Sequence, residues 1–319
     1  MNSIIIDGLS YALPLLVIAI GGIYSERSGI TNLALEGLLG FGAFSGALFV
    51  AATAGLFAPT SAVPLYVSFI VAALGGALFA LLHAVLCIKF RANQVISGVV
   101  VNIVSVALTG FFTSQINAVV FGQASNKFML QTSPRWTVPV ISKIPVLGAV
   151  FTNFYPFEIL ILLILGFCWY VLYRTRYGLR LRAAGDNPQA LDAAGVEVTR
   201  VRFVAVLASG ALAGVGGMCF AYSISTNFSP AIYFGSGYLA IAALIFGNWK
   251  IMPTFGACLI FGLARSSAYQ LVLSMNADAS MADLAMITPY VITLILLAIF
   301  SKSNRAPRAL GELYDKSKR

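Results

Sequence analysis

The sequence predicts an all-α, polytopic membrane protein with about eight or nine transmembrane helices, one of them short or broken. Of its 319 residues, 59% are hydrophobic and only 10% are charged, and the mean hydropathy is +0.90. A soluble domain could not bury so much apolar surface behind so few charges. The net charge of +9 does not indicate a nucleic-acid partner, because the basic residues lie in short loops and in the tail beside apolar segments.

Seven apolar runs are long enough to cross a bilayer, which takes about 20 residues. They cover residues 4–24, 33–54, 65–88, 95–113, 156–173, 202–223 and 253–274, and two shorter candidates lie at 237–249 and 286–301. We expect segment 237–249 to be a half-helix or a tilted piece that ends inside the protein. Such an end is tolerated at membrane depth only where protein surrounds it.

The placement of Lys and Arg predicts the orientation of these spans. If the C-terminus is cytosolic and the chain crosses the membrane nine times, most of the basic residues lie on the cytosolic side and the N-terminus lies outside. Residues 1–301 are then the transmembrane domain, and residues 302–319 are a basic cytosolic tail. We expect this tail to be solvated, partly disordered and within reach of anionic membrane lipid.

One external segment, residues 114–155, is too long for a tight connection. It carries three prolines and three basic residues, Lys127, Arg135 and Lys143. Two interpretations remain open. The segment is either a poorly packed loop or a lid or docking surface on the outer face.

A polar, basic island at Tyr177–Phe203, which overlaps a predicted cytosolic loop at 174–202, has the composition of a surface for a soluble partner. Its sequence predicts a helix of about two turns. Asn187 can cap this helix, Pro188 can take its first position, and Gly195 can end it.

Small residues recur inside two of the spans. Gly42 and Gly46 are four residues apart in the second span, and so are Gly210 and Gly214 in the sixth. Such spacing lets helix backbones approach closely in a membrane. The glycines either serve this packing alone or also let helices shift and expose backbone along a pathway.

Polar residues at membrane depth are costly and indicate function. Gly98, Asn102, Ser105 and Thr109 fall on one helical face. This face can line a solute pathway, which we favour, or hold helices together through hydrogen bonds. Two charged residues are further pathway candidates, Glu36 in the second span and Arg265 in the last long one. Arg265 could instead pair with an acid or extend toward the membrane surface.

Several kinds of chemistry are missing from the sequence. It has no GxxxxGK[ST] phosphate loop, no HExxH or GxSxG motif and no acidic metal cluster. Its four cysteines lie in apolar runs without a CxxC pair, and it has a single histidine. We therefore expect no enzyme activity, no cofactor and no metal in this chain. A transport protein of this kind would depend on a motor in another subunit.

Four blocks of sequence resemble the permease subunits of ATP-binding-cassette importers. They read SERSGITNLALEG (25–37), NQVISGVVVN (93–102), RTRYGLRLRAAGDNPQALDAAGV (174–196), and SGALAGVGG with LAIAALIFGNW (209–217 and 239–249). The likeness is to the branched-chain amino acid and ribose-type group. Within it, the chain most resembles nucleoside or simple-sugar permeases that work with basic-membrane-lipoprotein-type receptors.

This resemblance implies a large-cavity importer permease in a bacterial cytoplasmic membrane, with a solute path at a dimer interface. It also implies an ATPase subunit, a second permease, an extracytoplasmic substrate-binding protein and a nucleoside substrate. The 187–195 helix would be the coupling helix, and Asp186 stands where Glu is common. The coupling residues carried over are Arg182, Gly185, Asp186, Asn187, Pro188, Asp192 and Gly195. The alternatives are a simple-sugar importer and a secondary transporter that needs no motor.

Overall fold

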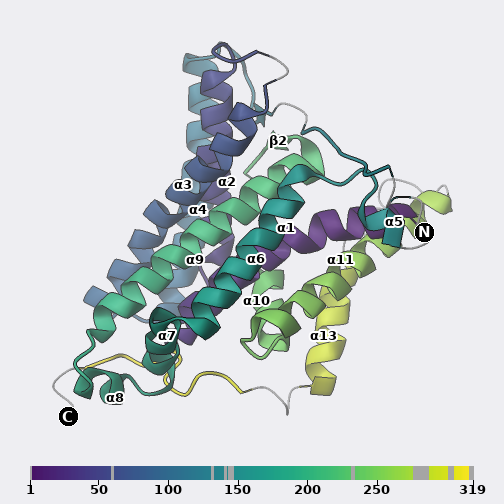
Figure 1. Ribbon diagram of the computed structural model, residues 1–319. Coiled ribbons are helices and arrows are strands. Elements are labelled where there is room, and N and C mark those ends of the chain that lie inside the picture. The colour runs from purple at the N-terminus through teal and green to yellow at the C-terminus, as the bar shows by residue number, and fades with distance from the viewer. Residues whose placement is uncertain are drawn as a thin grey trace.

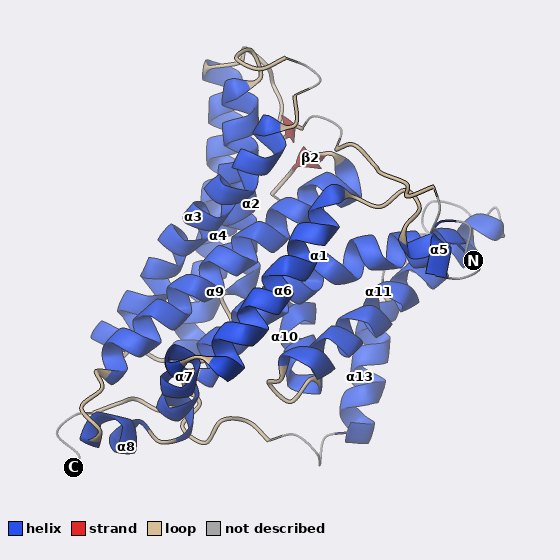
Figure 2. Cartoon of the chain, viewed as in Figure 1, coloured by secondary structure: helices blue, strands red, loops and turns tan. Residues whose placement is uncertain are grey.

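The computed structural model describes residues 2–58, 61–130, 133–139, 142, 147–230, 234–275, 287–300 and 305–315, and these are mostly helical (Figures 1 and 2). Among the described residues, seven helices are long and apolar enough to cross a membrane. They are α1 (Asn2–Arg27), α2 (Leu35–Thr53), α3 (Val63–Ala84, extended by the π-helical turn η1, Val85–Lys89), α4 (Gln94–Val119), α6 (Pro156–Arg174), α9 (Val198–Phe220, extended by η3, Ala221–Ser225) and α11 (Ile251–Ser274). These helices coincide with the seven predicted spans, and the predicted fold class is confirmed.

Shorter helices complete the chain. They are α5 (Leu147–Val150), α7 (Arg176–Asp186), α8 (Pro188–Ala193), α10 (Ser236–Phe246) and α13 (Thr288–Phe300). The 11 residues of α10 rise about 16 Å, roughly half of the ~30 Å hydrocarbon core of a bilayer. The prediction of a half-helix at 237–249 is therefore confirmed. The other short candidate, 286–301, contains α13.

Helix α1 forms the centre of the bundle. Every residue from Ser10 to Glu26 is buried, and the helix packs on α6, α9, α10 and α11. A helix that is apolar all round is expected in the interior of a large assembly of helices. It contacts α7 at one end of the molecule and α5 and η3 toward the other, so it connects the two ends that are described below.

The glycines of α2, α3 and α9 are positions of backbone contact. A Cβ atom on Gly42 would meet the Cα atom of Gly214, and one on Gly76 would meet the carbonyl oxygen of Gly210. The three helices therefore touch through their backbones, as small residues permit in membranes. The packing interpretation of the glycine pairs is confirmed by these contacts.

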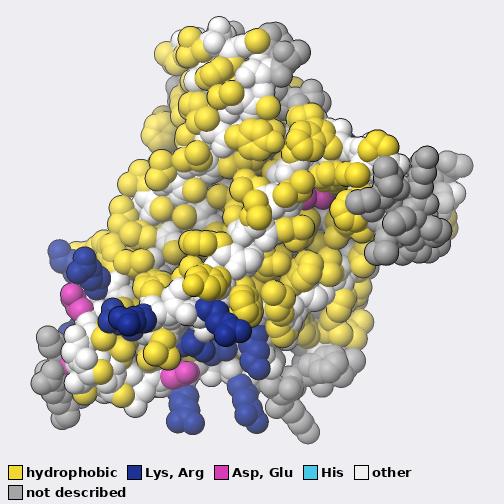
Figure 3. Space-filling model, viewed as in Figure 1, with side chains coloured by type: hydrophobic (Ala, Val, Ile, Leu, Met, Phe, Trp, Pro, Cys, Tyr) yellow, Lys and Arg dark blue, Asp and Glu magenta, His cyan; other side chains and the backbone are white. Residues whose placement is uncertain are grey.

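The two ends of the bundle differ in character. Lys and Arg side chains gather at the end that carries α7 and α8, which we call the basic end (Figure 3). At the opposite end, the strand β1 (Phe128–Met129) pairs antiparallel with β2 (Asn227–Phe228), and Trp136 forms a bridge with Phe154. Where the structure describes it, the 114–155 segment contacts the bundle through β1, while most of its described residues are exposed. Both interpretations of this segment stay open.

Candidate functional site

The island at the basic end folds as its sequence predicts around α8. The Asn187 side-chain oxygen accepts a hydrogen bond from the Ala190 amide at 3.0 Å, and Pro188 is the first helical residue. Gly195 has a φ of 78°, the left-handed conformation that ends many helices and that glycine adopts without strain. The short helix at this position is confirmed, while its docking role stays a prediction.

The preceding helix, α7, was missed by the sequence analysis, which treated its residues as part of a polar loop. Its buried residues are Gly178, Leu181, Ala184 and Gly185, a spacing that matches one helical face. A Cβ atom on Gly185 would meet the carbonyl oxygen of Arg27. Gly185 thus brings α7 against the end of α1, a contact that no larger residue allows.

The remaining predicted coupling residues surround an exposed surface. Pro188 and Leu191 of α8 point inward, whereas Asp186 is exposed and Asp192 is partly exposed. Arg182 packs its guanidinium 5.7 Å from the centre of the Tyr173 ring. Between α7 and α8 lies a shallow groove of about 450 Å³, lined mainly by apolar residues that include Leu179, Ala183, Ala190, Leu191 and Ala194.

The described part of the C-terminal tail, residues 305–315, makes backbone hydrogen bonds to this region, whereas we expected a solvated and partly disordered tail. The Ala309 amide donates to the Gly185 carbonyl at 2.8 Å, and the Gly311 amide donates to the Gly29 carbonyl at 3.1 Å. Arg91 forms an ion pair with Asp315 at 3.5 Å. The described part of the tail, residues 305–315, therefore joins α7 to the end of α1. The physical reason is that backbone amides of the tail form hydrogen bonds with backbone carbonyls of α7 and of the loop after α1, so these groups are satisfied.

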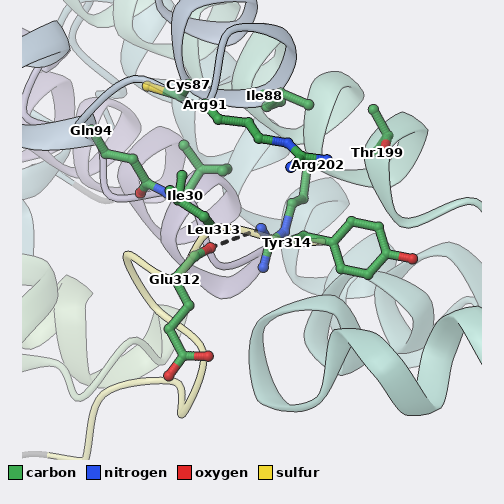
Figure 4. Close-up of a pocket in the computed structure, with 10 residues that line it drawn as sticks. All are labelled: Ile30, Cys87, Ile88, Arg91, Gln94, Thr199, Arg202, Glu312, Leu313 and Tyr314. Atoms are coloured by element: carbon green, nitrogen blue, oxygen red, sulfur yellow. Dashed lines mark hydrogen bonds between the residues drawn. The ribbon is translucent and has the colours of Figure 1, made fainter. Parts of the chain in front are cut away.

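Arg202 holds the same three segments together from inside. Its guanidinium donates to the carbonyl oxygens of Ser28 at 3.0 Å, Glu312 at 3.1 Å and Ala184 at 3.3 Å. Figure 4 shows Arg202 with its bond to Glu312 and the Tyr314 ring nearby, on the wall of a cavity of about 110 Å³. The sequence did not predict this role for Arg202. Its burial, with 2% of its surface exposed, has no signal in the sequence.

Within the membrane, Glu36 occupies the N-terminus of the half-helix α10. Its two carboxylate oxygens accept hydrogen bonds from the Gly235 amide at 2.7 Å and the Gly237 amide at 2.6 Å. Glu36 also lies in the first turn of α2. Helix N-termini carry partial positive charge and unpaired amides, so the positive ends of two helices stabilise one buried carboxylate.

Asn102 extends this junction to α4. Its side-chain oxygen accepts from the Gly37 amide at 2.7 Å, and its side-chain nitrogen donates to the Leu33 carbonyl at 2.8 Å and the Tyr238 hydroxyl at 3.1 Å. Ser105 donates to the Gly37 carbonyl at 2.7 Å. We call Glu36, Asn102, Ser105 and Tyr238 the polar junction.

The predicted pathway face therefore makes interhelical contacts in this structure. Asn102, Ser105 and Thr109 are buried, and the Thr109 hydroxyl donates to the Val106 carbonyl of its own helix at 3.3 Å. A Cβ atom on Gly98 would lie 2.8 Å from the Leu33 side chain. That this face also borders a solute pathway stays a prediction.

Arg265, the last predicted pathway residue, has other neighbours. Its guanidinium carbon lies 4.1 Å from the centre of the Tyr11 ring in α1. This distance is that of a cation–π contact. Arg265 lies in the half of α11 that is remote from the basic end, so it faces a different part of the molecule from α7 and α8.

Comparison with known proteins gives a consistent set of similarities. The family model "Branched-chain amino acid transport system / permease component" matches residues 4–299. The nucleoside ABC transporter permease protein NupC of Lactococcus lactis subsp. cremoris is 41% identical over 100% of this chain and 98% of its own length. The guanosine ABC transporter permease protein NupQ of Bacillus subtilis is 36% identical, covering 98% of this chain and 96% of NupQ.

A third relative is named for a different substrate. The putative glucose ABC transporter permease protein TsgC13 of Haloferax volcanii is 30% identical, covering 91% of this chain and 84% of its own length. No solved structure shows significant similarity to the chain. The similarity to all three relatives extends over nearly the whole chain, so it includes both the polar junction and the basic end.

The polar junction generates a prediction for stability. Replacing Glu36 with Ala removes the acceptor for two buried amides, and an unsatisfied buried group costs about 1–3 kcal/mol. We expect the thermal unfolding temperature of the detergent-solubilised protein to fall clearly. The control is Thr53→Ala, which removes a hydroxyl bonded only to the Phe49 carbonyl of its own helix. Equal unfolding temperatures for the two variants would contradict the role assigned to Glu36.

Arg202 generates a second prediction. Lysine cannot reproduce the planar, forked set of donors of arginine, so Arg202→Lys should release the tail. We expect a lower unfolding temperature and faster tryptic cleavage after the exposed Arg308. Arg200→Lys is the matched control, because Arg200 lies two residues away on the same helix and is exposed. Unchanged protection of Arg308 in Arg202→Lys would show that the tail is held by other contacts.

Proposed function

The chain belongs to the branched-chain amino acid transport system permease family, and from this premise we propose that it carries a nucleoside across the membrane for an ATP-driven importer. The chain is a multi-pass membrane protein, and as an ABC permease it requires an ATPase partner. The observation that carries the proposal is the full-length similarity to the nucleoside and guanosine permeases. The capped helix α8 at the basic end supports it.

The ATPase is proposed to bind at the groove between α7 and α8. Two features support this surface. The groove is largely apolar and exposed, although basic residues surround it. An exposed apolar patch with a polar rim is typical of a surface that binds another protein. Its support is rigid, because Gly185, Arg202 and the tail fix α7 against α1. Movement of a bound ATPase would therefore be transmitted to the membrane domain rather than absorbed in a loop.

A second permease chain is proposed to cover α11. In an 18-residue apolar stretch of this helix, 28% of the residues are buried, compared with 67% of the residues in the corresponding stretches of α1 and α9. Its exposed residues include Ser267 and Ser274, which are poorly suited to lipid. A solute path between two chains would use this face. Tyr238 is 46% exposed and would connect this path to the polar junction. The predicted path residues would then border the path; they are Gly98, Asn102, Ser105, Thr109 and Glu36.

The basic end is proposed to face the cytosol of a bacterial cell, as the excess of Lys and Arg indicates. An extracytoplasmic substrate-binding protein would then deliver the solute at the opposite end, where the 114–155 segment lies. A simple sugar is the second candidate substrate. The similarity to the putative glucose permease TsgC13 favours it, but at lower identity than the similarity to NupC.

Uptake by the assembled importer tests both coupling and substrate. Gly195→Val places a β-branched residue at φ 78°, a conformation that such residues rarely adopt. It should abolish ATP-dependent uptake of labelled guanosine by membrane vesicles. Gly195→Asn is the matched control, because asparagine tolerates this conformation and no atom lies within 4 Å of an added Cβ. Uptake of glucose but not guanosine by the unmodified importer would favour the second candidate.

Cysteine labelling tests the orientation. The four native cysteines are buried, so the unmodified chain should react weakly with an impermeant thiol reagent. Gln123→Cys, at the end opposite α8, should react in intact cells. Gln189→Cys, on the exposed side of α8, should react only after permeabilisation. The reverse pattern would place the basic end outside and remove the proposed ATPase site.

A further inference from the structure

A hollow of about 460 Å³ opens on the basic end, next to the groove between α7 and α8. Four segments form its wall: the end of α1, the end of α7, the turn between α10 and α11 (residues 247–250), and the tail. We call it the basic pocket, because most of its charged residues are cations. The residues that matter here are Arg27, Asp186, Asn248, Lys250, Arg305 and Arg308.

The basic pocket has an excess of positive charge. Lys250, Arg305 and Arg308 are exposed, and no cation of the pocket forms an ion pair with a described residue. The lining holds one carboxylate, that of Asp186, against four cations. A hollow lined mainly by one sign of charge concentrates the electric field and attracts the opposite charge, so this pocket suits an anionic group.

Hydrogen bonds hold the walls of the basic pocket in place. The Arg305 amide donates to the Asn248 side-chain oxygen at 2.7 Å, and Arg27 Nε donates to the Trp249 carbonyl oxygen at 3.0 Å. The tail is also bonded to the end of α7. The backbone segments that carry the cations are therefore joined to one another, and an anion that binds here does not have to order them first.

The turn between α10 and α11 has an unfavourable backbone conformation. Asn248 has a φ of 53° and Trp249 has a φ of 54°, a left-handed conformation that is rare for a bulky residue. The Trp249 indole donates to the buried Glu26 carboxylate, which fixes the turn against the end of α1. Strained conformations gather at binding surfaces, and this one places Lys250 on the wall of the pocket.

We propose that the basic pocket binds carboxylate side chains of the ATPase subunit, an inference that rests on the proposed function. Asp186 lines both the pocket and the groove between α7 and α8, so a subunit that sits on the groove would also cover the pocket. A cation that a partner covers loses water and requires an opposite charge from that partner. The groove would supply apolar contact area, and the pocket would select the ATPase that carries acidic residues at the matching place.

The position of the pocket disfavours a lipid headgroup as its occupant. Arg27 ends α1, the central helix of the bundle, which packs on α6, α9, α10 and α11. The pocket therefore lies toward the middle of the basic end, whereas lipid borders the outer helices. Figure 3 shows Lys and Arg side chains that project from this end, away from the apolar surface. A soluble subunit reaches such side chains directly.

The first test is cross-linking of the complete importer with a carbodiimide. This reagent takes up the water that is lost when a lysine amine and a carboxylate in contact form an amide. Lys250 should become joined to an Asp or Glu of the ATPase, as mass spectrometry of the digested complex would show. Lys250→Arg is the matched control, because it keeps the charge without an amine that couples. It should retain the ATPase and lose this cross-link.

The second test is charge reversal. Lys250→Glu and Arg308→Glu should each raise the Kd between the ATPase and the assembled permease in neutral-lipid nanodiscs about tenfold. Lys250 directly precedes the first turn of α11, where a carboxylate stabilises a helix, so this variant should fold. Arg200→Glu makes the same change in charge at an exposed position that lines neither hollow, and it should leave Kd unchanged.

The outcomes separate this inference from the proposed function. An ATPase that does not bind the unmodified permease would refute the proposed function. A bound ATPase that forms no cross-link with Lys250, or an equal Kd for all three charge reversals, would refute the basic pocket alone. Pocket variants that keep the ATPase but lose bound phosphatidylglycerol would assign the pocket to a lipid headgroup and overturn the proposal.

Discussion

The structure depends on how it satisfies the amides at the start of a helix that begins inside the membrane. Helix α10 begins at Ser236, and lipid offers no partner for the backbone groups exposed at such a start. The Glu36 carboxylate supplies two acceptors, to Gly235 and Gly237. Since Glu36 belongs to the first turn of α2, the same bonds fix α2 against α10. Asn102 then joins α4 to both, so three helices meet at one charge.

The basic end uses the inverse arrangement. There the groups that need partners are carbonyl oxygens, of Ser28, Ala184 and Glu312, and the charge that meets them is the cation of Arg202. A buried anion at helix N-termini and a buried cation at chain carbonyls follow the same rule, that a buried charge is tolerated where several hydrogen bonds surround it. Through α1, which is buried from Ser10 to Glu26, the two arrangements belong to one rigid core.

The sequence predicted what depends on local patterns. Seven spans, the short α10 and the capped start of α8 follow from hydropathy and from Asn187 and Pro188, which act on their own neighbours. It did not predict α7, because the arginines of this segment suggested a polar loop, although the segment has a buried helical face made mostly of small residues. Nor could it predict the packed tail or the bonds of Arg202, which join segments more than 100 residues apart.

The glycine contacts determine where the molecule can move. Gly42 meets Gly214 and Gly76 meets Gly210 with backbone against backbone, and such contacts leave no side-chain layer that could rearrange. Packed interiors of this kind change between discrete arrangements rather than deforming gradually. The exposed face of α11 has no comparable contact. Rigid-body movement of this chain against a partner at α11 therefore disturbs less packing than sliding α2, α3 and α9 past one another.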